Sequence, residues 1–168
     1  NMKITIRGVN IAKRHDDALV GVTIVGDGSV RQQKESSAWS AMILDAEGSG
    51  TIIYGLCNVQ EDIHAGELLP YCMAMRSLRN CMPEKPRLRE RVYLLSDNRN
   101  IVAQHTKGIT NHFTSGMWQE IENYKKTHFD IYFAHHSRES SEAIKLMDRI
   151  CRVVQGKQAG INDAVRHV

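Results

Sequence analysis

Four carboxylates in this sequence stand near the ends of predicted elements or on the last predicted helix. They are Asp27, Glu67, Asp97 and Asp148. Carboxylate oxygens bind hard cations such as Mg²⁺ or Mn²⁺, and two such ions about 4 Å apart can activate a water and stabilise the leaving oxygen in phosphodiester cleavage. Such a site needs three or four acidic side chains from separate elements. The pattern therefore indicates a divalent-metal site, provided that the fold brings these residues together.

A histidine beside such a site would exchange protons near neutral pH, because its unperturbed pKa is about 6.5. The sequence has eight histidines, and His135 and His136 directly follow the last predicted strand. No His-x-x-x-His or Cys-His spacing indicates zinc. One of this pair is a candidate for proton transfer, and the remaining histidines are interpreted mostly as surface residues.

Apolar runs predict the strands that would position these residues. They fall at residues 19–25, 38–44, 51–57, 92–96 and 130–134. The first three follow one another through short connections, which is typical of an antiparallel meander. Asp27 follows the first strand and Asp97 follows the fourth. Asp27 has a second interpretation, as a turn residue between Gly26 and Gly28 that shapes a hairpin.

Apolar residues at helical spacing predict four helices. They fall at residues 66–82, 100–105, 117–129 and 140–154. Proline is tolerated near the start of a helix, so Pro70 places Glu67 close to the N-terminus of the first one. Glu67 is then also interpretable as a first-turn carboxylate favoured by the helix dipole. By the same reasoning Asp97 with Asn98 is interpretable as a helix cap, and Asp148 as an exposed residue of an amphipathic helix.

Length and composition indicate one domain with its own core, since the 168 residues are 42% hydrophobic. We expect a domain over residues 19–154, an N-terminal extension over 1–18 that packs on it, and a C-terminal tail over 155–168. No apolar run approaches the roughly 20 residues of a membrane span, and "NMKITIRGVN" lacks the apolar core of a secretory signal. The four cysteines show no Cys-x-x-Cys spacing and are expected to be reduced. These features argue against a membrane or secreted protein and predict a cytoplasmic one.

The charge of the chain permits a polyanionic partner. The formal net charge is +3, which is only mildly basic. Six basic residues lie within sixteen positions: Arg76, Arg79, Lys85, Arg87, Arg89 and Arg91. This basic cluster is either a surface that faces phosphates or simply a solvated surface.

In their order and motifs these elements resemble the ribonuclease H family. "VGDGS" is similar to the Asp-Gly-Ser of the family's first strand, and "AGELLPYCMAM" to the helix that carries its glutamate. "LLSDN" is similar to the family's strand-four aspartate, and a late histidine is followed by an aspartate in the terminal helix. The resemblance covers residues 19–154. It implies an α/β fold with a five-stranded mixed sheet, its first three strands an antiparallel meander, and helices on both faces.

The resemblance also implies an activity. It implies an endonuclease that hydrolyses the RNA strand of RNA/DNA hybrids with two Mg²⁺ or Mn²⁺ ions, by in-line attack of water that leaves 5′-phosphate and 3′-hydroxyl ends. The implied metal ligands are Asp27, Glu67, Asp97 and Asp148. His136, or its neighbour His135, would assist product departure or proton transfer. The oligomeric state is not predicted.

The sequence departs from the family pattern in three places. "IHAGE" stands where an asparagine-rich segment commonly reads the RNA sugar hydroxyls, and "ESSAW" replaces a glycine-rich entry into the second strand. The segment from His136 to Asp148 is longer than usual and contains no glycine, so Glu142 is an alternative fourth ligand. The nucleic acid acted on therefore stays open.

Two other functions stay open beside the hybrid nuclease. The first is a non-catalytic ribonuclease H-like module that binds nucleic acid or protein within a larger assembly. The second is a related nuclease that acts on DNA. A basic side chain inserted among Asp27, Glu67 and Asp97 would favour the binding module. The glycines beside Asp27 would let a nucleic-acid backbone approach the metals closely.

Overall fold

The structure is a computed structural model that describes residues 2–6, 21–29, 37–45, 49–57, 63–107 and 114–156. The predicted N-terminal extension beyond Ile6 and the predicted tail beyond Gly156 lie outside the described residues. The domain boundaries therefore stay predictions.

The described strands form one sheet in the order β1-β4-β3-β2-β5-β6. In this sheet β2 (Val22–Ser29), β3 (Ser37–Leu44) and β4 (Gly50–Cys57) pair as an antiparallel meander. The strand β5 (Glu90–Ser96) runs parallel to β2, and β6 (Phe129–His135) runs parallel to β5. This arrangement confirms the predicted mixed sheet of five strands with its meander.

A sixth strand, β1 (Met2–Ile6), pairs antiparallel with β4 at the edge of the sheet. It lies within the segment that was interpreted as an extension. Its sequence, "MKITI", alternates apolar and polar residues, which is the pattern of a half-buried strand. Five residues carry that pattern only weakly, and the sequence reading therefore missed the strand.

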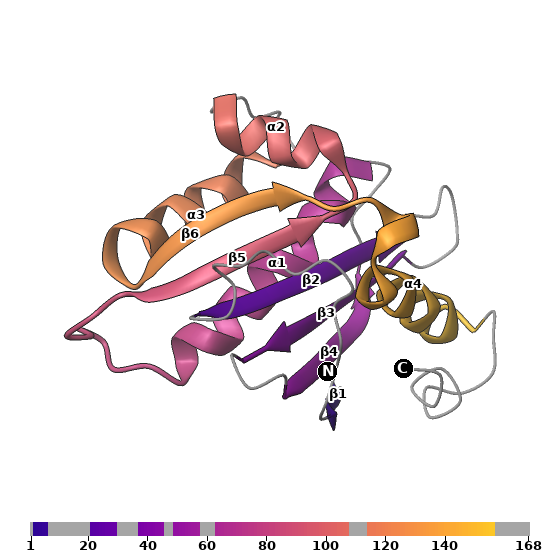
Figure 1. The fold of residues 1–168 in the computed structure, drawn as a ribbon, viewed down its shortest axis with the longest axis horizontal. Helices are drawn as coiled ribbons and strands as arrows, with labels where there is room; N and C mark the ends of the chain where they lie inside the picture. The colour runs from indigo at the N-terminus through magenta and orange to yellow at the C-terminus, as the bar shows by residue number, and fades with distance from the viewer. Residues whose placement is uncertain are drawn as a thin grey trace.

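Helices cover both faces of the sheet (Figure 1). The described helices are α1 (Ile63–Asn80), α2 (Arg99–Lys107), α3 (Ser115–Thr127) and α4 (Glu142–Val154). Side chains of α1, α2 and α3 pack with Ile24 and Leu94 in one apolar cluster. Side chains of α4 pack with Val25 and Leu95 in a second cluster. Neighbouring residues of β2 and β5 thus point to opposite faces, as the period of a strand requires. In the part of the chain that the structure describes, no helix is long and apolar enough to cross a membrane.

The helix α1 lies so close to β2 that β2 has room only for glycine at the contact. A Cβ atom on Gly28 would lie 2.0 Å from the carbonyl oxygen of Gly66, and one on Gly26 would lie 2.9 Å from Cβ of Pro70. Pro70 is inside the helix, where its missing N–H leaves the Gly66 carbonyl without its helical hydrogen bond. The prediction that Pro70 lies in the first turn is wrong, because α1 begins at Ile63. The two glycines therefore serve helix packing, and the interpretation that they admit a nucleic-acid backbone is not needed.

The hydroxyl of Tyr71 joins α1 to two parallel strands. It donates to the carbonyl oxygen of Leu95 at 2.5 Å and accepts from the N–H of Gly26 at 3.3 Å. Burial raises the pKa of Tyr71 above its ordinary value, so the hydroxyl keeps its proton. One buried side chain thus fixes β2 and β5 relative to the helix between them in sequence.

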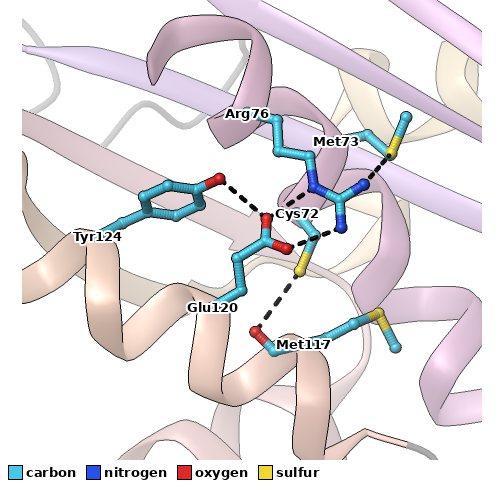
Figure 2. Close-up of polar contacts among 6 residues, drawn as sticks. All are labelled: Cys72, Met73, Arg76, Met117, Glu120 and Tyr124. Carbon is cyan, nitrogen blue, oxygen red and sulfur yellow. Dashed lines mark hydrogen bonds and ion pairs between the residues drawn. The ribbon is translucent and has the colours of Figure 1, made fainter. Parts of the chain in front are cut away.

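A polar contact also fastens α1 to α3 (Figure 2). The Arg76 guanidinium donates two hydrogen bonds to the Glu120 carboxylate, from Nε to Oε2 at 2.8 Å and from Nη2 to Oε1 at 2.7 Å. Tyr124 donates its hydroxyl to the same carboxylate at 3.0 Å, and the Cys72 thiol donates to the carbonyl oxygen of Met117 at 3.7 Å. Arg76 is a member of the predicted basic cluster, and this contact gives it a packing role.

Replacement of Gly28 by alanine should force β2 and α1 apart. We expect the free energy of unfolding to fall by about 1–3 kcal/mol, the usual cost of overpacking, as measured by urea denaturation. Gly116 of α3 is the matched control, because a Cβ atom there would meet nothing within 4 Å. G116A should leave stability unchanged or raise it slightly. Equal stabilities for G28A and G116A would contradict the close contact.

Candidate functional site

Asp27 lies within β2 and not after it. The strand continues to Ser29, and Asp27 is paired in register with Ser40 of β3. The interpretation of Asp27 as a turn residue is therefore wrong. Pairing of β2 with β5 ends at Val25, so Asp27 lies just beyond the point where the two parallel strands separate. Its side chain is buried, with 7% exposure for the whole residue.

Asp97 directly follows β5, and the residue that caps α2 is its neighbour Asn98. The side-chain oxygen of Asn98 accepts from the backbone N–H groups of Asn100 at 2.9 Å and Ile101 at 3.2 Å. The N–H of Asn98 in turn donates to the hydroxyl of Ser96 at 3.0 Å. Because Asn98 caps the helix, the Asp97 carboxylate is available for the site.

Glu67 is the fifth residue of α1 and lies in its second turn. The interpretation of Glu67 as a first-turn carboxylate is therefore wrong. The close contact of Gly66 with Gly28 brings Glu67 to β2, where the N–H of Gly28 donates to its carboxylate. The other oxygen, Oε2, is buried and has no hydrogen-bond partner among the described residues.

The carboxylates of Asp27, Glu67 and Asp97 converge. One oxygen of each lies within 4.8 Å of the others, and we call these three residues the acidic triad. Burial, followed by repulsion from neighbouring carboxylates, raises the pKa of Asp27 well above its ordinary value and that of Glu67 to about 8. Burial also raises the pKa of Asp97, and the positive charge of Arg138 opposes this shift. A hard divalent cation would relieve the repulsion and give the buried Oε2 of Glu67 a partner, so the triad fits Mg²⁺ or Mn²⁺.

Asp148 lies beside the triad but outside it. Its Oδ2 atom receives two guanidinium groups, Nη2 of Arg138 at 2.5 Å and Nη2 of Arg152 at 3.0 Å. The negative charge of Asp148 raises the pKa of each triad residue, which places it within electrostatic reach. The structure therefore brings three of the four predicted ligands together. The fourth, Asp148, forms ion pairs with two arginines. Its role as a ligand stays a prediction.

The other predicted residues, Glu142 and the histidine pair, lie on α4 and at the end of β6. Glu142 is exposed in the first turn of α4, with Oε1 at 3.5 Å from Nζ of Lys145. His135 ends β6 in register with Ser96 of β5, and the backbone N–H of His136 donates to the carbonyl oxygen of Ser96 at 2.8 Å. The histidine pair therefore lies at the strand end that leads to Asp97.

Three residues that the sequence analysis overlooked support the site. Arg138 lies on η2 (Arg138–Ser140), the short 3₁₀ turn between β6 and α4. The hydroxyl of Ser40 donates to the carbonyl oxygen of Met147 at 2.7 Å, and the thiol of Cys151 donates to that of Asp27 at 3.4 Å. The first contact holds α4 against β3, and the second holds it against β2, the strand that carries Asp27. The only signal for Arg138 in the sequence was a basic residue between the histidine pair and Asp148.

The fold is ribonuclease H-like and carries a cluster of three carboxylates, one buried and two half-buried. The chain is similar to LC11-RNase H1 in complex with an RNA/DNA hybrid, with a TM-score of 0.65, 16% identity, and coverage of 86% of this chain and 99% of that chain. It is similar to the N-terminal RNase H domain of a Mycobacterium tuberculosis protein, with a TM-score of 0.63, 12% identity, and coverage of 88% and 98%. A foamy viral protease-reverse transcriptase in complex with an RNA/DNA hybrid gives a TM-score of 0.60 and 12% identity, over 85% of this chain and 21% of that chain.

No family model and no curated protein matches the sequence. At these identities the solved structures show the fold alone. They confirm the predicted ribonuclease H-like fold, at a distance in sequence that makes the chain divergent.

Without a bound cation, the protein should lose stability as the pH rises. The folded state raises the pKa of Glu67 from 4.5 to about 8. The folded chain therefore holds a proton that the unfolded chain releases. This contribution is complete below the unfolded pKa and disappears as the pH rises through the folded pKa. The raised pKa values of Asp27 and Asp97 act in the same direction. In a chelator, we expect the free energy of unfolding to fall by on the order of 2 kcal/mol between pH 5 and pH 8.

Urea denaturation at several pH values checks this expectation. E67Q should flatten the dependence, whereas E122Q, at an exposed position of α3, should keep it. Addition of Mg²⁺ at pH 8 should restore stability to the wild type. A free energy of unfolding that rises between pH 5 and pH 8 in the chelator would contradict the raised pKa values of the triad.

Proposed function

We propose that this protein is a divalent-metal-dependent endonuclease that hydrolyses the RNA strand of RNA/DNA hybrids. The observation that carries the proposal is the acidic triad: three carboxylates from β2, α1 and the end of β5, within 4.8 Å of one another. The triad lies on a ribonuclease H-like fold, and two of the structural neighbours are described in complex with RNA/DNA hybrids. Fold alone does not fix activity, so the site carries the proposal.

The triad would hold the cation from two neighbouring strands and one helix. Asp27 and Asp97 would bind the cation from the strand side. Glu67 would either bind a cation or orient the attacking water through Oε2, the oxygen without a hydrogen-bond partner among the described residues. A divalent ion bound there supplies Lewis-acid stabilisation of the scissile phosphate and activation of the attacking water. We expect two ions, and products with 5′-phosphate and 3′-hydroxyl ends.

Asp148 is the better candidate for the fourth ligand. Its charge acts on all three triad residues, whereas Glu142 is not among the charges that shift their pKa values most. His135 or His136, beside Ser96, would transfer a proton near neutral pH. The charge of His135 opposes the rise in the pKa of Asp97, which places His135 within electrostatic reach of the triad.

Arg138 favours a second candidate, a non-catalytic module that binds nucleic acid. Its positive charge opposes the rise in the pKa of each triad residue. The chain itself therefore supplies part of the positive charge that a bound cation would supply. The guanidinium forms an ion pair with Asp148. Among the contacts described, none joins it to a carboxylate of the triad. The triad therefore keeps its own cation site, and we prefer the nuclease.

Replacement of Asp27 by asparagine should abolish cleavage. We expect wild type to cut the RNA strand of a labelled RNA/DNA hybrid only with Mg²⁺ or Mn²⁺, and D27N to lose roughly a hundredfold or more in kcat while it still binds the hybrid. D45N is the matched control, because Asp45 follows the end of β3, where Leu44 pairs with Thr23 and not with Asp27, and accepts a hydrogen bond from the N–H of Ser49.

The same assay separates the alternatives. Undiminished cleavage by D27N would contradict the mechanism. Cleavage of duplex or single-stranded DNA in preference to the hybrid would identify a related DNA nuclease. Hybrid binding by the wild type without any cleavage would identify the binding module.

A further inference from the structure

We propose that Arg138 is a built-in counter-ion that holds Asp148 away from the acidic triad, so that a second divalent ion binds only when the Arg138–Asp148 ion pair opens. The inference rests on the proposed metal centre. It adds an order of binding: the first ion goes to the triad, and the second ion must compete with a side chain of the protein.

The geometry of Asp148 carries the first step. Two guanidinium groups meet one carboxylate oxygen, Oδ2, at 2.5 Å from Arg138 and 3.0 Å from Arg152. The side chain of Asp148 is only 17% exposed, whereas each arginine side chain is 46% exposed. The Arg138–Asp148 ion pair is therefore partly shielded from water. Such an ion pair is stronger than one that is fully exposed on the surface.

The two arginines differ in their relation to the triad. Arg138 reaches Asp148 from η2, before α4, and its charge is among the strongest that act on Asp27, Glu67 and Asp97. Arg152 reaches the same oxygen from one turn further along α4 and is not among those strongest charges. Both arginines thus bind Asp148, and of the two only Arg138 is among the strongest charges that act on the triad.

The chemistry of the guanidinium carries the last step. The triad supplies three oxygen ligands for one cation, and an ion between the triad and Asp148 would have to bind a carboxylate whose Oδ2 atom already accepts from Arg138 and Arg152. A guanidinium stays charged at every pH of interest, so it competes with that ion and also repels it. The second ion should therefore bind more weakly than the first until Arg138 moves.

Mn²⁺ binding to the metal-free full chain, without nucleic acid, tests the inference. The free ion is measured by electron paramagnetic resonance, and the affinities are checked by calorimetry. We expect the wild type to bind one ion and to bind a second at least tenfold more weakly. R138Q should strengthen the second step by about tenfold, and R138K, which keeps the charge, should not. R152Q is the comparison variant and should strengthen the second step by less than R138Q does, because Arg152 binds the same oxygen but is not among the strongest charges that act on the triad.

The variants separate failure of the inference from failure of the metal centre. Addition of D148N to R138Q should remove the gain, because the second ion would lose its ligand. Two steps in R138Q equal to those of wild type would overturn the inference, as would an equal gain in R152Q. Failure of the wild type to bind Mn²⁺, or binding that D27N leaves unchanged, would overturn the proposed metal centre itself. Circular dichroism of each variant verifies that it is folded.

Discussion

The contact between α1 and β2 sets the geometry of the candidate site. A side chain at Gly28 would meet the carbonyl oxygen of Gly66 at 2.0 Å, so the two backbones lie as close as glycine permits. Glu67 follows Gly66 directly and is thereby placed beside Asp27. The Tyr71 hydroxyl, one turn further along α1, fixes β5 through its hydrogen bond to Leu95. The three carboxylates therefore meet because the core packs in this way.

This packing creates an electrostatic conflict. Three carboxylates, one buried and two half-buried, lie close to one another, and burial with their mutual repulsion raises the pKa of Glu67 to about 8. Repulsion of this kind lowers the stability of a metal-free chain at neutral pH, and a divalent cation removes it. Arg138 offsets part of the negative charge without entering the triad, through its ion pair with Asp148. The chain thus keeps a site that favours cations while limiting the cost of having none bound.

Much of the fold could be predicted from the sequence, because the strands and helices are marked by apolar periodicity and the motifs occur in a known order. Asp27 and Asp97 could be placed near strand ends for the same reason. The course of β2 beyond Asp27 and the start of α1 at Ile63 could not be predicted, since apolar periodicity marks neither boundary. Arg138 was missed because its contact with a residue ten positions along the chain exists only once α4 is docked.

Diffraction from crystals of the wild-type protein soaked in Mn²⁺ near neutral pH, recorded for anomalous scattering, tests the central claim most directly. We predict a peak bounded by carboxylate oxygens of Asp27, Glu67 and Asp97, with Oε2 of Glu67 among its ligands. An ordered site that holds no Mn²⁺ between these three carboxylates, or Mn²⁺ bound only elsewhere on the chain, would contradict the claim.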